Sequence, residues 1–208
     1  MTIFTFAWNR FGEGPYQVEF TLEFPLTEDG EVEEGPTVFV AEMAPLELMP
    51  HSVHLFLEMV GHELLPGTSF HRNAHHVIQA GPSPYFANAG ANVRKGFTVN
   101  RLTSVSFQEY SADFPHEKYT MGFAGRPGGP DWYVSTMDNT RNHGPGGQTS
   151  YALASEADPC FAKIVSGFDA VDRVSEGTVK PGWYNGLEKN VGFKKVRLLP
   201  KEELITSS

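Results

Sequence analysis

The chain has one cysteine, Cys160, among its 208 residues, so no disulfide can form within it. It has no apolar run of membrane-spanning length, and residues 1–8 lack the basic start and long apolar core of a secretory signal. Sixteen basic residues against 25 acidic ones give a formal net charge of -9, which argues against a nucleic-acid partner. These absences favour a soluble cytoplasmic protein, with an organelle or a lumen left open if a targeting segment was removed.

The composition predicts a β-rich fold. Aromatic residues make up 12% of the chain, and 21 Gly and 15 Pro are typical of short elements joined by tight turns. Long periodic helices are scarce. We expect one domain over residues 1–208, in which 1–14 form an N-terminal extension without a clear period and 138–157 form an extended loop.

Strict alternation marks the clearest strand. Residues 17–24 alternate polar and apolar, which directs Val18, Phe20, Leu22 and Phe24 inward. The acidic segment 27–35 then connects this strand to a partner at 37–43. Further predicted strands cover 69–72, 77–81, 119–124, 131–136, 160–165 and 191–199.

Two helices are predicted from apolar spacing. The first covers residues 53–60, with Ser52 as its cap and Gly61 as its end, and the second covers 167–174. The Pro-, Gly-, Ala- and Asn-rich segment that runs to about Gly96 is expected to be a surface loop.

Arg72 is the residue most suggestive of chemistry. It lies at the end of the predicted strand 69–72 and carries a permanently charged, five-donor fork. Taken alone, a structural ion pair explains it better than catalysis. A metal site at His71, His75 and His76 is not expected, because no convincing carboxylate partner accompanies them. Cys160 lacks an activating base, so we expect neither a catalytic thiol nor a cofactor.

The order of several motifs resembles the cyclophilin family of peptidyl-prolyl isomerases. The resemblance rests on segments distributed over most of the chain, namely 50–56, 70–72, 79–81, 121–124, 129–134, 161–165 and 167–171. It implies a mainly β fold, a closed eight-stranded antiparallel barrel capped by two α-helices, with a peptide groove on its outside.

The resemblance also implies a site. Arg72 matches the catalytic arginine of the family, and Gln79 matches its supporting glutamine if one residue is missing between the two. Gly125 stands where the family has a binding asparagine, and Leu153 or Tyr151 falls near its tryptophan. The implied substrate-binding positions are Phe70, His76, Val77, Gln79, Ala124, Gly125, Asp131, Tyr133, Leu153 and Asp158.

Three of these positions depart from the family pattern. Asp131 replaces a glutamine, Tyr133 replaces the phenylalanine of the proline pocket, and Asp158 replaces a histidine. Asp131 could orient the guanidinium of Arg72 or capture it in an ion pair.

The implied function is isomerisation of X-Pro bonds in peptides or client proteins by a monomer, with reduced or altered activity. The alternative is a non-catalytic module or scaffold that binds proline-containing peptides on the same fold.

Overall fold

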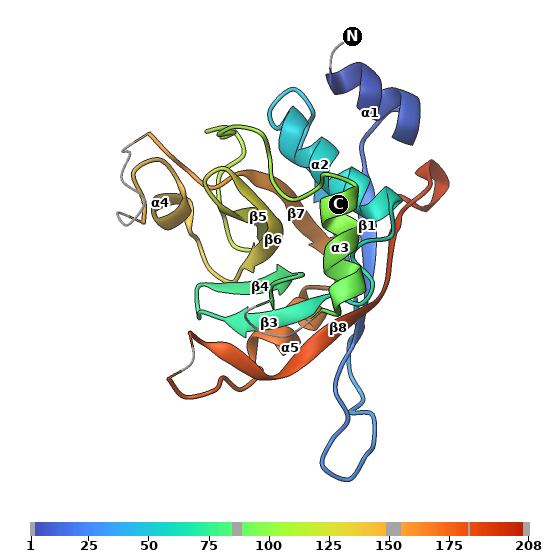
Figure 1. Cartoon of the computed structure of the whole chain (residues 1–208), viewed down its shortest axis with the longest axis vertical. Coiled ribbons are helices and arrows are strands. Elements are labelled where there is room, and N and C mark those ends of the chain that lie inside the picture. Colours follow the sequence, from blue (N-terminus) through green and yellow to red (C-terminus); the bar gives the residue numbers. More distant parts are fainter. Residues whose placement is uncertain (1–2, 85–88, 149–154, 183, 206–208) are drawn as a thin grey trace.

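The computed structural model describes residues 3–84, 89–148, 155–182 and 184–205, and a closed antiparallel β-barrel forms its centre (Figure 1). Around the barrel the strands follow the order β1-β2-β7-β5-β6-β4-β3-β8. Their bounds are β1 Gln17–Glu23, β2 Val38–Met43, β3 Ser69–Asn73, β4 Val77–Gly81, β5 Thr120–Gly125, β6 Gly128–Ser135, β7 Cys160–Ser166 and β8 Gly186–Leu198. The predicted eight-stranded barrel is confirmed.

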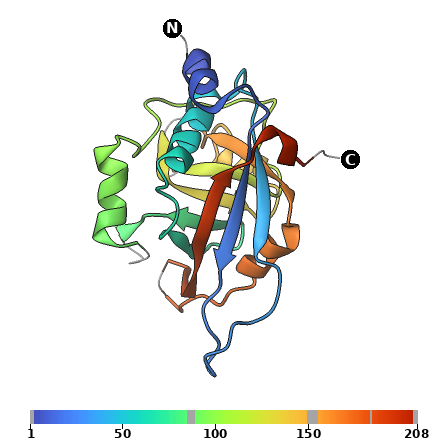
Figure 2. The same cartoon turned by 90° about the vertical axis from the view of Figure 1, so that its right-hand side faces the viewer.

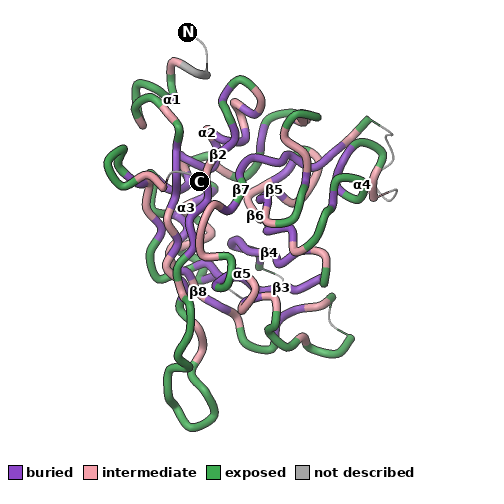
Figure 3. Tube along the Cα trace, turned by 180° about the vertical axis from the view of Figure 1, so that it is seen from behind, coloured by how far each residue is buried: buried purple, intermediate pink, exposed green. Residues whose placement is uncertain are grey.

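Aromatic side chains fill the barrel interior. On β1, Val18, Phe20 and Leu22 are buried as the alternation predicts, and Phe24 packs against the core while partly exposed. The ring of Phe20 stacks on Phe39 with a centroid distance of 4.5 Å. Figure 3 shows the buried backbone concentrated in the strands. Because the interior is packed with side chains, a peptide has to bind on the outside of the barrel.

Two helices cover the openings of the barrel. They are α2, Pro50–Gly61, and α5, Phe168–Ser175. The fully buried Phe56 of α2 reaches the centre of the core, where its ring lies 5.7 Å from that of Trp132. Both helices coincide with the helices predicted from apolar spacing.

The predicted cap of α2 is wrong. The helix begins at Pro50 after Met49, so Ser52 lies inside the first turn rather than before it. The carboxylate of Glu109 accepts the backbone N–H groups of His51 and Ser52 at 2.9 and 2.7 Å. A residue 57 positions away therefore caps this helix, which local sequence does not reveal.

Two further helices occur where the sequence predicted none. Residues 1–14 have no clear period, yet α1 covers Ile3–Phe11 and packs on α2 (Figure 2). The expected loop to Gly96 contains α3, Ala91–Val99, whose one buried residue is Phe97. A helix held by one apolar contact leaves too weak a periodic pattern to detect.

The remaining differences concern element ends. Strand β8 begins at Gly186, before the predicted start at 191, and β6 begins inside the expected turn 125–130. The extended loop 138–157 contains the short helix α4, Thr140–His143, and a 3-10 turn, Lys201–Glu203, follows β8. No helix in the described part of the chain is long and apolar enough to cross a membrane.

Candidate functional site

A β-bulge places Arg72 opposite Gln79. Phe70 pairs with Ala80 and Arg72 pairs with Gln79, so His71 is an extra residue on β3. This accounts for the spacing between Arg72 and Gln79 in the sequence. Nη1 of Arg72 donates a hydrogen bond of 3.0 Å to Oε1 of Gln79, and its Nε donates to the carbonyl oxygen of Tyr184 at 2.9 Å. Two fixed acceptors thus orient the guanidinium.

Asp131 reaches Arg72 through Gln79. Nε2 of Gln79 donates to Oδ2 of Asp131 over 3.5 Å, so the amide lies between the carboxyl group and the guanidinium. Burial raises the pKa of Asp131 to about 7, against the opposing effect of its hydrogen bonds with Gln79 and Ser83. This arrangement corresponds to the orienting role considered for Asp131.

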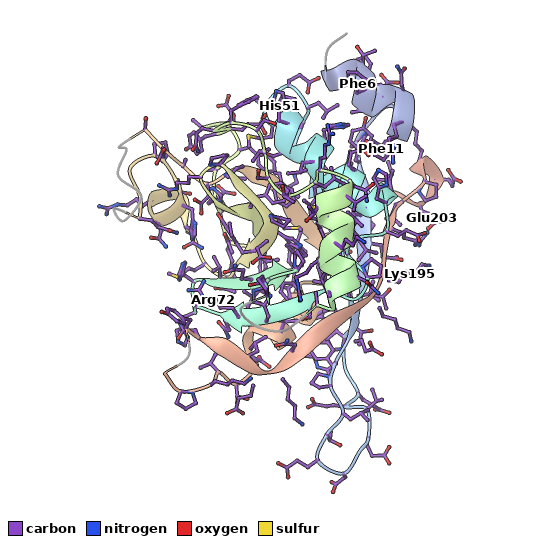
Figure 4. All side chains as sticks on the ribbon, in the orientation of Figure 1. Phe6, Phe11, His51, Arg72, Lys195 and Glu203 are labelled. Carbon is purple, nitrogen blue, oxygen red and sulfur yellow. The ribbon has the colours of Figure 1, made fainter. Side chains whose placement is uncertain are left out.

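Arg72 lines a groove of about 430 Å³ on the outside of the barrel, at the free ends of β3 and β4 (Figure 4). We call it the Arg72 groove. The positions expected from the sequence that line it are Arg72, His76, Val77, Gln79, Ala124, Gly125, Tyr133 and Asp158.

The other expected positions lie elsewhere. Phe70 is fully buried inside the barrel, where its ring centroid lies 5.5 Å from that of Trp132, so its expected place in the groove is corrected. It precedes the bulge and keeps the inward face of β3. Asp131 lines an adjacent pocket of about 320 Å³, and Leu153 lies outside the described residues.

The ring of Tyr133 forms a buried wall of the groove. Tyr133 is 2% exposed, on β6, and Gly122 on the neighbouring strand β5 leaves room for its ring. A Cβ atom at Gly122 would lie 2.6 Å from the phenol oxygen of Tyr133. Val77 and Ala124 pack beside the same ring. These three side chains provide the apolar surface that a proline ring requires.

A buried ionic network supports this wall. Asp158 accepts from Nε of Arg126 at 2.7 Å through Oδ1, and Nδ1 of His143 lies 2.5 Å from its Oδ2. The hydroxyl of Tyr133 donates to the same Oδ2 at 3.1 Å. Burial opposes ionisation of Asp158, but its hydrogen bonds and charge interactions with His143 and Arg126 prevail and lower its pKa.

His116 completes the network in its neutral form. Its Nε2 lies 2.9 Å from the carbonyl oxygen of Asp158, and burial lowers its pKa to about 4. Burial raises the pKa of Tyr133 well above its ordinary value, and the nearby charge of Asp158 acts in the same direction. The phenol is therefore a neutral donor at physiological pH.

Sequence reasoning missed Asn142, His143 and Gln148, which line the Arg72 groove from the 138–157 loop, and Arg126 beneath it. His143 is the most buried of the loop residues, at 3% exposed. Its partner Asp158 is 15 positions away, and no local pattern marks such a pair. The excess of polar side chains in the loop was the one available signal.

Neither a metal site nor a reactive thiol accompanies the groove among the described residues. No group of three or more His, Cys, Asp and Glu side chains in that part of the chain is arranged to hold a metal ion. Burial raises the pKa of Cys160 to about 12, so its thiol stays protonated.

No protein-family model matches this chain, and no curated protein matches its sequence. Its structure is similar to the crystal structure of a cyclophilin-type peptidyl-prolyl cis-trans isomerase from Cryptosporidium parvum. The TM-score is 0.60 and the identity 10%, over 89% of this chain and 98% of that one. A second structure of that protein, obtained in the presence of the dipeptide Ala-Pro, has a TM-score of 0.60 and 10% identity, over 89% and 99% of the two chains. The chain has the cyclophilin fold.

Proposed function

We propose that this protein is a peptidyl-prolyl cis-trans isomerase that acts on X-Pro bonds of peptides and client proteins. The observation that carries the proposal is the orientation of Arg72 by Gln79 and the Tyr184 carbonyl at the edge of a groove with an apolar wall. The fold is that of cyclophilin-type isomerases, and one similar structure was obtained with a proline-containing dipeptide present.

The chemistry requires no covalent step. Rotation about the X-Pro bond must overcome an amide barrier of roughly 18–20 kcal/mol. As the bond twists, the proline nitrogen becomes pyramidal and gains a lone pair. A guanidinium beside it donates a hydrogen bond that the planar ground state cannot accept equally well, which lowers the barrier. In this proposal Arg72 is that donor, and Val77, Ala124 and the Tyr133 ring hold the proline.

The substitutions in the groove suggest a rate below that of a typical family member. Gly125 provides no side chain at the wall where the resemblance predicts a binding asparagine. A lost hydrogen bond to the peptide would weaken substrate binding by about 0.5–1.5 kcal/mol. The same feature favours a second candidate function, a proline-peptide-binding module without catalysis.

The test is the cis-to-trans rate of a short X-Pro peptide with the parent protein, Arg72→Ala and Arg72→Lys. We expect acceleration by the parent and loss of at least about tenfold in both variants, since lysine keeps the charge but not the fork. Lys195→Ala is the matched control, because it removes one exposed positive charge on β8, away from the groove (Figure 4). Peptide binding without acceleration by a folded parent would favour the binding module.

A further inference from the structure

Two histidine rings face one another in the Arg72 groove. The imidazoles of His76, on the turn before β4, and His143, at the end of α4, stack with a centroid distance of 5.4 Å and an interplanar angle of 27°. Arg72 lines the same groove. Three side chains able to carry positive charge therefore converge on one cavity of an otherwise acidic protein.

The acidic side chain that lines this groove is already engaged. Both carboxylate oxygens of Asp158 are committed, Oδ1 to Arg126 and Oδ2 to His143 and Tyr133. Asp158 is 4% exposed, so its charge is directed at the buried network below the groove. The positive groups above it have no counterion among the described lining residues.

The protonation of His76 reflects this imbalance. Burial lowers the pKa of His76 most, and the charges of His143, Arg72 and His75 lower it further, against the hydrogen bond from its Nδ1 to the Ala74 carbonyl oxygen. An anion in the groove would offset those three repulsions and favour the charged imidazole. The charged groups around His143 are Asp158 and Arg126, with His116 and Tyr133 also against its ring.

We infer that the Arg72 groove selects acidic peptide segments, in which the residue next to the proline carries a carboxylate. Rows of like charge without a counterion are unfavourable in a partly desolvated cavity, and a carboxylate that accepts hydrogen bonds from Arg72 and His76 relieves this. The resemblance predicts an apolar side chain at position 76, so this feature belongs to this chain. The inference rests on the proposed use of the groove for X-Pro peptides.

Proton linkage gives the inference a second signature. If carboxylate binding favours protonated His76, then binding takes up protons and tightens as the pH falls. A glutamine in place of the glutamate in the peptide removes the charge at nearly constant shape, and its binding should depend little on pH.

The experiment is a calorimetric titration of the parent with the peptides Ala-Glu-Pro-Phe, Ala-Gln-Pro-Phe and Ala-Lys-Pro-Phe at pH 6 and pH 8. We expect the glutamate peptide to bind about fivefold more tightly than the glutamine peptide at pH 6, a difference of about 1 kcal/mol. We expect the lysine peptide to bind most weakly and the preference to shrink at pH 8. Equal binding of the three peptides would overturn the inference.

Variants identify the groups responsible. His76→Phe restores an apolar wall and should abolish the preference for glutamate, and His143→Gln should reduce it. His62→Gln, an exposed histidine beyond the end of α2, is the matched control and should leave the preference intact. A preference that survives His76→Phe in a folded protein contradicts the inference. Because the titration reads binding, its outcome is independent of the isomerase rates that test the proposed function.

Discussion

The hydroxyl group of Tyr133 donates a hydrogen bond of 3.1 Å to Oδ2 of Asp158, the same oxygen that faces Nδ1 of His143. A tyrosine in place of a phenylalanine adds a polar group that must find a partner when buried. Here Asp158, which replaces a histidine of the family pattern, is that partner. The two departures compensate each other, and the ring of Tyr133 still forms the wall of the groove.

Tyr133→Phe should therefore cost little. It removes one hydrogen bond to an oxygen that retains His143, and we expect a loss of about 1 kcal/mol in the free energy of unfolding. The ring surface stays in place, so the isomerase rate should remain within about threefold of the parent. Urea denaturation and the peptide assay measure the two quantities. A folded Tyr133→Phe protein without activity would show that the hydroxyl takes part in the reaction.

Glu109 should contribute measurably to stability as the cap of α2. Glu109→Ala leaves the N–H groups of His51 and Ser52 without their acceptor, and we expect a loss of about 1–3 kcal/mol in the free energy of unfolding. Ser52→Ala is the matched comparison, since Oγ of Ser52 is buried and has no hydrogen-bond partner among the described residues. Its change should be within about 0.5 kcal/mol. The reverse order in thermal and urea unfolding would contradict this assignment.

Asp131 should make stability depend on pH. Its pKa in the folded protein is raised to about 7 by burial, above its value of about 3.9 in an unfolded chain. Between these two values the folded protein binds the additional proton, so stability is greatest at low pH and falls as the pH rises toward 7. The decrease from this group is at most about 4 kcal/mol.

Asp131→Asn removes this dependence while keeping an acceptor for Nε2 of Gln79. We expect the variant to gain stability relative to the parent as the pH rises from 5 to 8, measured by urea denaturation at each pH. An Asp131→Asn effect that is constant over this range would mean that Asp131 is ionised throughout it.

The sequence by itself determined the elements whose signals are local. Alternation on β1 and apolar spacing on α2 and α5 predicted their positions, since a period of two or of 3.6 residues directs side chains to one face. The abundance of aromatic residues agreed with a core built around Phe20, Phe56 and Trp132. The order of motifs resembling cyclophilins led to the correct barrel and to Arg72 in a groove.

Only the tertiary structure decided how the site is assembled. The bulge at His71 sets Arg72 opposite Gln79, and closure of the barrel brings Arg126, His143 and Asp158 into one buried network. Such contacts depend on which strands and loops become neighbours in space, and residue spacing does not encode that. Glu109 on α2 follows the same rule, because a hydrogen-bond acceptor 57 positions away is invisible in any local pattern.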